Sequence, residues 1–321
     1  MLENKSIMLK DKLTVLVNSC DSYEDLWIPF FTLYRKYWDD KSVRLLLNTE
    51  SKDFSLDGLQ IECIHCDDSR YGARMLNALS QIETEYVLIL LDDFFLRSSV
   101  DLNRIFQITQ WMDNDRDIVY FNSDCTKVCA DWEKNKYPGF KRVPPGSEYT
   151  LNLQAAVWRK TELMRYWEKN ISPWEWEAFV NARTFGEHKK KFYATTDWSN
   201  AICDYGYKAE GMGVYRGKWV LEDVSPLFEK ENITLDFSKR GEYNPEHDVG
   251  RMQTNTRLEW YDCVIRCLGK RVLCYYILHR IWHKVSALFG KQTVNPDFVL
   301  YLQEKAQRRF LKDLGEQNDK G

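Results

Sequence analysis

The chain has 321 residues, of which 44% are hydrophobic and 29% are charged, as in an ordinary globular protein. The 45 Lys and Arg residues nearly balance the 48 Asp and Glu residues, and the net charge of −3 gives no reason to expect a nucleic-acid partner. No apolar run approaches the roughly 20 residues that span a bilayer, and the opening stretch MLENKSIMLKDK carries no apolar signal region.

The 9 cysteines are scattered without the regular spacing of a disulfide scaffold. We therefore expect reduced thiols and a cytoplasmic protein. Two close pairs raise the question of a zinc site. Cys63 and Cys66 would point to opposite faces of a strand, and Cys263 and Cys267 lie at helical spacing in an apolar stretch. We interpret both pairs as structural thiols.

Short apolar runs alternate with amphipathic segments from the start of the chain. The apolar runs predict strands over residues 13–19, 43–48, 59–66, 86–91 and 117–123. Apolar residues at helical spacing predict helices over residues 23–38, 72–82 and 102–112. This alternation predicts right-handed βαβ units, and so a Rossmann-like α/β domain with a mainly parallel sheet.

Ligands of such sheets bind beyond the carboxyl ends of the strands. The polar residues that follow the predicted strands are Ser19, Asp21, Asn48, Glu50, Asp67, Asp68, Asp92 and Asp93. The strand YVLILL runs directly into the last two aspartates. Because Mg²⁺ and Mn²⁺ prefer carboxylate and phosphate oxygens, this pair predicts a cation site beside a diphosphate. The alternative is that one of the two aspartates only caps the next segment.

The run YGARMLNALSQIETEYVLILLDDFFL resembles the corresponding stretch of GT-A-type glycosyltransferases. There, a helix with an Ala-Arg-x-x-Asn-like segment precedes a strand that ends in an Asp-x-Asp region. The resemblance implies that Arg74 and Asn77 lie on that helix, that Arg74 contacts the donor, and that Asp93 is the first and Asp92 the second metal ligand or donor contact. The motif here is Leu-Asp-Asp-Phe, which leaves a metal-independent variant open.

The same resemblance implies that the end of the first strand contacts the nucleobase and ribose of the donor. Ser19 and Asp21 lie there, and Asp21 is the principal candidate.

The segment ISPWEWEAFVNAR follows a predicted strand and helix within residues 151–167. Ser172 suits an N-cap and Pro173 a first turn, and carboxylates there are favoured by the helix dipole. SPWEWE resembles the helix start that carries the catalytic base of inverting GT-A enzymes, and the Trp-x-Phe/Trp-Glu pattern of bacterial capsule and lipopolysaccharide glycosyltransferases. Residues two apart do not share a helix face, so we expect one glutamate to point into the site and the other away. The resemblance places the more constant carboxylate at the end of the Trp-x-Trp-Glu run, so we choose Glu177 as the base and Glu175 as second candidate. Ordinary capping with buried tryptophans is the alternative.

The resemblance covers roughly residues 12–220 and implies inverting transfer of a sugar from a nucleotide sugar, UDP-linked by default, to a glycan or lipid-linked glycan. We expect a catalytic domain over residues 1–250, with a donor half to about residue 125 and an acceptor half beyond, and a C-terminal helical region over residues 251–321. One alternative is a non-catalytic carbohydrate-binding or scaffold protein on a decayed transferase fold. The other is a sugar-nucleotide nucleotidyltransferase, which the glycine-free loop NSCDSYEDLW disfavours.

Residues 257–291 carry seven Lys and Arg against two acids, with apolar residues mostly three or four apart. A basic amphipathic helix with aromatic residues suits the headgroup region of an anionic membrane. This predicts peripheral contact with the inner face of the cytoplasmic membrane. The alternative is a helical appendage packed on the catalytic domain or on a second copy in a homo-oligomer.

Overall fold

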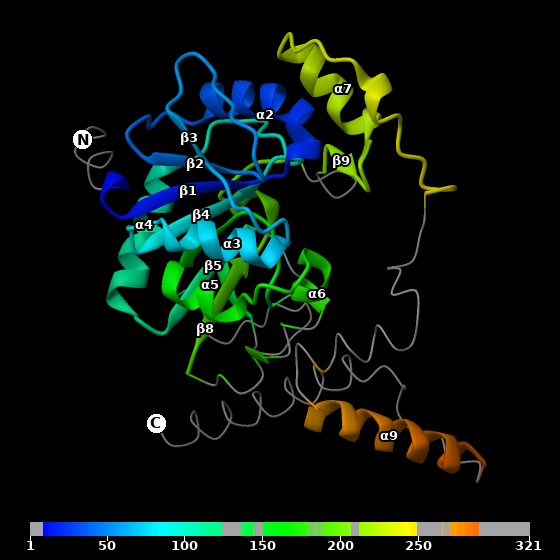
Figure 1. Cartoon of the computed structure of the whole chain (residues 1–321). Helices are drawn as coiled ribbons and strands as arrows, with labels where there is room; N and C mark the ends of the chain where they lie inside the picture. Colours follow the sequence, from blue (N-terminus) through cyan, green and yellow to red (C-terminus); the bar gives the residue numbers. More distant parts are fainter. Residues whose placement is uncertain are drawn as a thin grey trace.

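The computed structural model describes residues 9–123, 136–143, 150–178, 189–206, 212–248 and 270–288, with residues 145, 180, 183–184, 187 and 265. Within these residues an eight-stranded sheet has the order β3-β2-β1-β4-β7-β5-β8-β6 (Figure 1). The strands are β1 Leu13–Asn18, β2 Arg44–Asn48, β3 Ile61–Ile64, β4 Tyr86–Leu91, β5 Ile118–Asn122, β6 Phe140–Val143, β7 Ala156–Arg159 and β8 Lys191–Thr195.

The sheet is mostly parallel. β1 pairs in parallel with β2 and with β4, β2 with β3, and β5 with β8. β7 runs antiparallel between β4 and β5, and β6 runs antiparallel to β8 at the edge. The predicted Rossmann-like α/β class with a mainly parallel sheet is therefore confirmed.

The helices are α2 Glu24–Tyr37, α3 Tyr71–Ser80, α4 Leu102–Asn114, α5 Lys160–Tyr166, α6 Pro173–Ala178, α7 Leu221–Lys230 and α9 Lys270–Leu288. The ends of α2, α3 and α4 differ from the predicted ranges by at most two residues, and α7 was not predicted. Short 3-10 turns cover η1 Asp21–Tyr23, η3 Trp198–Asn200 and η5 Phe237–Lys239. A small hairpin joins β9 Val214–Tyr215 to β10 Lys218–Trp219.

Helices cover both faces of the sheet, because alternate residues of each buried strand point to opposite sides. Val15 and Val17 belong to one apolar cluster, with residues of α2, α4 and α7, whereas Leu16 belongs to a second, with residues of α3, α5 and α6. Figure 1 shows α3 and α5 together in front of the strands. The carboxyl ends of β1, β2 and β4 are thus held between two packed layers.

The C-terminal helical region is described only at residue 265 and in α9, and Cys263 and Cys267 lie outside the described residues. Among the residues that are described, no helix combines the length and apolarity needed to cross a bilayer. The five cysteines whose state is described are free thiols, as predicted, namely Cys20, Cys63, Cys66, Cys203 and Cys274.

Candidate functional site

The carboxyl ends of β1 and β4 meet because these strands pair in register, with Asn18 opposite Leu91. Ser19 and Asp92 follow these residues, and both are buried. The Ser19 hydroxyl donates a hydrogen bond to Asp92 Oδ2 and accepts one from Trp27 Nε1 at 2.7 Å. The structure thus brings together two of the residues that the sequence analysis placed at this edge.

Asp92 is buried, and Asp93 beside it is half-buried with its Oδ1 enclosed. Burial raises the pKa of both, and the charge of Asp93 raises that of Asp92 further. The pKa of Asp93 rises to about 7, although a backbone hydrogen bond and the positive charge of Arg240 act against the shift. Asp93 Oδ1 is buried and has no hydrogen-bond partner within the described part of the chain. The pair is therefore poised to ionise when a cation approaches.

Arg240 is a site residue that the sequence analysis missed. It follows η5, and its side chain is only 8% exposed. Its guanidinium donates to both carboxylate oxygens of Asp25, at 2.6 and 2.7 Å, and to the carbonyl of Ser22 at 2.8 Å, and it lies 4.2 Å from the ring centre of Tyr23. No local pattern around Arg240 signals this position, since only folding brings residue 240 beside β1 and β4.

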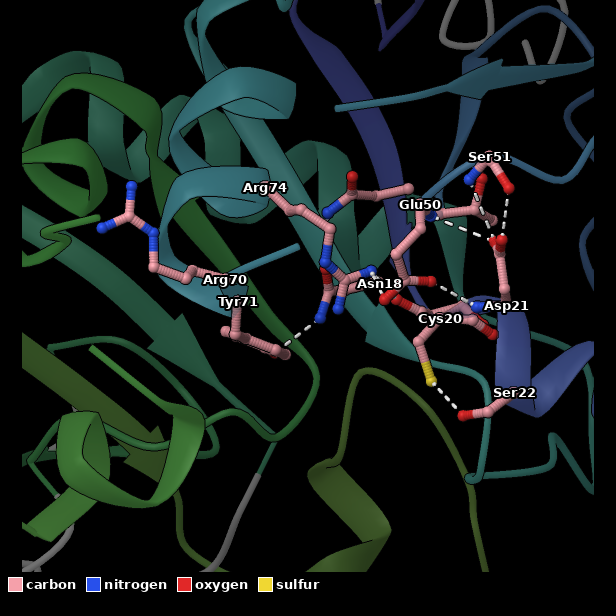
Figure 2. A network of polar contacts seen from close by, with 12 residues as sticks. Asn18, Cys20, Asp21, Ser22, Glu50, Ser51, Arg70, Tyr71 and Arg74 are labelled. Carbon is pink, nitrogen blue, oxygen red and sulfur yellow. Dashed lines mark hydrogen bonds and ion pairs between the residues drawn. The ribbon is translucent and has the colours of Figure 1, made fainter. Parts of the chain in front are cut away.

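Asp21 ties the end of β1 to the loop that follows β2 (Figure 2). Its carboxylate accepts hydrogen bonds from the backbone N–H groups of Glu50, Ser51 and Lys52 at 3.1–3.2 Å, and from Ser51 Oγ at 2.6 Å. Burial raises the pKa of Asp21, but these bonds outweigh it and lower the pKa to about 2. Asp21 therefore shapes the loop as an ionised carboxylate, and its contact with a nucleoside stays a prediction.

Arg74 reaches the site from α3 and is buried. Its Nη1 donates to the carbonyl of Ser19 at 2.8 Å and lies 3.0 Å from Glu50 Oε1 (Figure 2). Arg74 Nε is buried without a hydrogen-bond partner within the described residues. Asn77 lies on α3 as expected, but its amide donates to the carbonyl of His65. Of these two residues, the structure places Arg74 at the end of β1.

Tyr71, the first residue of α3, contacts the end of β1. Its hydroxyl accepts a hydrogen bond from Asn18 Nδ2 at 2.5 Å (Figure 2). Burial is the main cause of its raised pKa, which Arg74 lowers and the negative charges of Glu177, Asp93 and Asp92 raise further. Glu177 and the aspartate pair thus act electrostatically on one phenol, which the sequence analysis had not singled out.

The two glutamates of α6 have different surroundings. Glu175 Oε2 accepts from the backbone N–H and the hydroxyl of Ser172, at 2.8 and 3.0 Å, and Ser172 Oγ accepts from the Glu175 N–H at 3.2 Å. This reciprocal arrangement is a capping box. Glu177 is half-buried, and its Oε1 accepts from the Leu153 N–H at 2.8 Å. Capping therefore explains Glu175, and Glu177 is the glutamate that acts on Tyr71.

The two tryptophans of this segment differ in burial. Trp176 is fully buried and stacks on Trp167 with ring centres 4.7 Å apart, whereas Trp174 is 58% exposed. Burial, the alternative raised from the sequence, holds for Trp176 only.

A cavity of about 370 Å³ lies beside the hairpin of β9 and β10. Gly213 precedes β9, and its N–H donates to the carbonyl of Asp93 at 2.7 Å, so the hairpin is held at the end of β4. A Cβ at Gly213 would lie 2.2 Å from the Phe95 ring, which is why this approach needs glycine. The cavity is lined by Met212, Tyr215, Val220, Leu221, Glu222, Glu242, Tyr243 and Pro245.

The donor set fits a hard cation that completes its coordination with ligand oxygens. Within the described residues, no three His, Cys, Asp or Glu side chains form a metal cluster. Asp92 and Asp93 nevertheless offer two carboxyl groups, and the buried Asp93 Oδ1 lacks a partner there. Mg²⁺ is typically held by one or two carboxylates with substrate phosphates, so two carboxylates are sufficient protein ligands.

No protein-family model and no curated protein matches the sequence. Several solved structures are similar in fold at low identity. A cytidylyltransferase from Leptospira borgpetersenii is 14% identical, with 58% of this chain and 76% of that chain covered and a TM-score of 0.38. CMP:2-keto-3-deoxy-manno-octonic acid synthetase with CTP is 12% identical, with 57% and 88% covered and a TM-score of 0.34. S. aureus TarS with UDP is 13% identical, with 58% of each chain covered and a TM-score of 0.39. Similarities this low assign no activity to the chain.

Proposed function

We propose that the protein is a glycosyltransferase that moves a sugar from a nucleotide sugar, UDP-linked by default, to a glycan or lipid-linked glycan. The observation that supports this most is the Asp92–Asp93 pair at the carboxyl end of β4, where Asp92 is buried beside Ser19 and the enclosed Asp93 Oδ1 has no partner among the described residues. In this proposal the donor-binding carboxylates come from the end of β4 and the base comes from α6, which are two different parts of the chain.

In this proposal Asp93 and Asp92 hold Mn²⁺ or Mg²⁺ next to the donor diphosphate. When bound, a divalent cation stabilises the charge that develops on the leaving nucleoside diphosphate. Asp93 Oδ1 has no hydrogen-bond partner among the residues that the structure describes, and this supports Asp93 as the first ligand. Arg74 is a second cation at the same edge, held by the carbonyl of Ser19 and by Glu50, and it favours a bound anion electrostatically.

Glu177 is proposed as the general base. It accepts the proton from an acceptor hydroxyl while that oxygen bonds to the anomeric carbon, and the bond from that carbon to the diphosphate oxygen breaks. Attack opposite the leaving group inverts the stereochemistry. The capping box of Glu175 leaves it as the second candidate.

A thermal-shift screen with UDP, CDP and UMP, each with and without Mn²⁺, tests the nucleotide site. A ligand at one hundred times its dissociation constant adds about 2.7 kcal/mol to the stability of the protein. We expect a nucleoside diphosphate with Mn²⁺ to stabilise the wild type and to stabilise Asp93→Asn far less. The matched control is Asp53→Asn, since the Asp53 side chain is 85% exposed.

Turnover is then measured as nucleoside diphosphate released from a panel of nucleotide sugars in the presence of glycan acceptors. Absence of stabilisation by every nucleotide would remove the proposed function. Release of pyrophosphate from a nucleoside triphosphate and a sugar acid would indicate a nucleotidyltransferase instead.

A further inference from the structure

Helix α9 is the most cationic described helix that also exposes a large apolar surface. Its 19 residues, KRVLCYYILHRIWHKVSAL, include the four cations Lys270, Arg271, Arg280 and Lys284 and no Asp or Glu. Figure 1 shows it at the edge of the molecule, away from the strands. The charge of this helix is therefore not balanced within the helix itself.

The exposed apolar side chains of α9 form a continuous stripe. Six of them are 38–84% exposed, namely Ile277, Leu278, Ile281, Trp282, Val285 and Leu288. At 100° per residue these positions fall within about 140° of the helix circumference. Lys284, which is exposed, borders this stripe, and the exposed Lys270 lies in line with it at the N-terminal end of the helix.

The helix is anchored to the domain near its N-terminal end. Leu273 is buried in the second apolar cluster, which also includes residues of α3, α5 and α6, and Ile265 packs against that cluster. The N-terminal end of α9 therefore packs on the domain, as the alternative of a packed appendage predicts. The stripe remains exposed.

We propose that the stripe of α9 docks on the surface of an anionic lipid bilayer, with its apolar side chains at the boundary of the headgroups and the acyl chains. Large apolar residues bordered by lysine match a surface that is apolar inside and negatively charged outside. Four cations within 19 residues would be costly to place in the bilayer core, so they favour a helix that lies along the membrane surface over one that crosses the bilayer. A second copy is disfavoured as the occupant, because two such helices would meet without a carboxylate to pair with either.

Cosedimentation of the full chain with vesicles tests this. At low salt we expect the wild type to pellet with mixed phosphatidylcholine and phosphatidylglycerol vesicles, to remain in the supernatant with phosphatidylcholine alone, and to be released by high salt. Ile281→Glu should lower partitioning into the vesicles by about tenfold or more, since it puts a charge where apolar surface would be buried in the bilayer. Lys284→Glu should lower the fraction bound to anionic vesicles and make this fraction less sensitive to salt.

Ile28→Glu is the matched control, since Ile28 on α2 and Ile281 on α9 are both helical isoleucines that are 54% exposed. It should bind vesicles as the wild type does, and circular dichroism should show every variant folded. Wild-type protein that stays in the supernatant with anionic vesicles would overturn the proposal, as would equal binding by Ile281→Glu. A dimer of the free chain that Ile281→Glu dissociates, without vesicle binding, would assign the stripe to a second copy. None of these results depends on sugar transfer.

Discussion

Two adjacent buried carboxyl groups destabilise the folded chain whenever both are charged. Burial removes the water that solvates the charged form, and each charge repels the other. Arg240 is the nearby cation that opposes this effect at both Asp92 and Asp93, but it is already paired with Asp25. Further positive charge beside the pair would therefore favour its ionised form.

The free energy of unfolding should therefore depend on pH through these carboxyl groups. In the unfolded chain an aspartate loses its proton near pH 4, whereas folded Asp93 holds it to about pH 7. Between these values the folded state binds more protons, so the stability contributed by this group falls as pH rises. Asp93→Asn should remove part of that fall and be more stable than the wild type at pH 8 by about 1–3 kcal/mol.

Urea unfolding at pH 4, 6 and 8 measures this difference. The stability advantage of Asp93→Asn should grow across this range and shrink when Mn²⁺ is added to the wild type. An advantage that is the same at all three values would show that the pair is solvated and that Asp93 titrates normally.

At the scale of the element, the start of α6 serves two purposes with two glutamates. Glu175 belongs to the capping box with Ser172, and Glu177 accepts from Leu153 and acts on Tyr71. One helix turn thus fixes its own N-terminus and also presents a carboxylate to the Leu153 N–H.

Substitutions at the two glutamates should separate these purposes. Glu177→Gln keeps an acceptor for the Leu153 N–H but cannot take a proton, so turnover should fall by ~10²–10⁴-fold with nucleotide affinity little changed. Glu175→Ala should lower the free energy of unfolding by about 0.5–2 kcal/mol through loss of the cap, with much less effect on turnover per folded molecule. A larger loss of turnover at Glu175 would reassign the base.

α3 lies in close backbone contact with the segment that precedes α6. Gly72 N–H donates to the carbonyl of Ile171 at 3.1 Å, and a Cβ at Gly72 would lie 2.0 Å from the carbonyl oxygen of Glu168. Only glycine allows this approach, because the atom in the way belongs to the backbone.

Gly72→Ala should therefore destabilise the protein. Alanine in a helix is usually favoured over glycine by about 1 kcal/mol, but overpacking costs about 1–3 kcal/mol and here would meet an immobile carbonyl. We expect a net loss of stability in urea unfolding and weaker nucleotide binding. Ser80→Ala, at the exposed end of the same helix, is the control. A variant as stable as the wild type would show that the two segments do not pack this closely.

At the scale of the whole molecule, the sheet order places the site. β1 and β4 are neighbours although β2, β3 and α3 separate them in sequence, and this brings Ser19 next to Asp92. Helices packed on both faces bury the strands and leave their carboxyl ends as the place where polar groups collect. Arg240 and the hairpin of β9 and β10, which come much later in the sequence, contact this edge through Asp25 and the carbonyl of Asp93.

The sequence by itself determined the strands and helices up to α6, except for β6, and the presence of Ser19, Asp92 and Asp93 at one sheet edge. These features follow from local periodicity and from the rule that parallel strands end together, both of which can be read along the chain. The placement of Arg74 on α3 followed from the resemblance.

Only the tertiary structure decided which polar groups were already engaged. Asp21 looks like a site residue in the sequence, but backbone N–H groups of the loop after β2, brought close by folding, occupy its carboxylate. The cap formed by Glu175 is local, since Ser172 lies only three residues before it. Arg240 and Tyr71 look ordinary in the sequence, yet long-range packing sets them against the aspartate pair and, for Tyr71, within the field of Glu177. Hydrogen-bond partners and burial depend on contacts between distant residues, and no local pattern contains them.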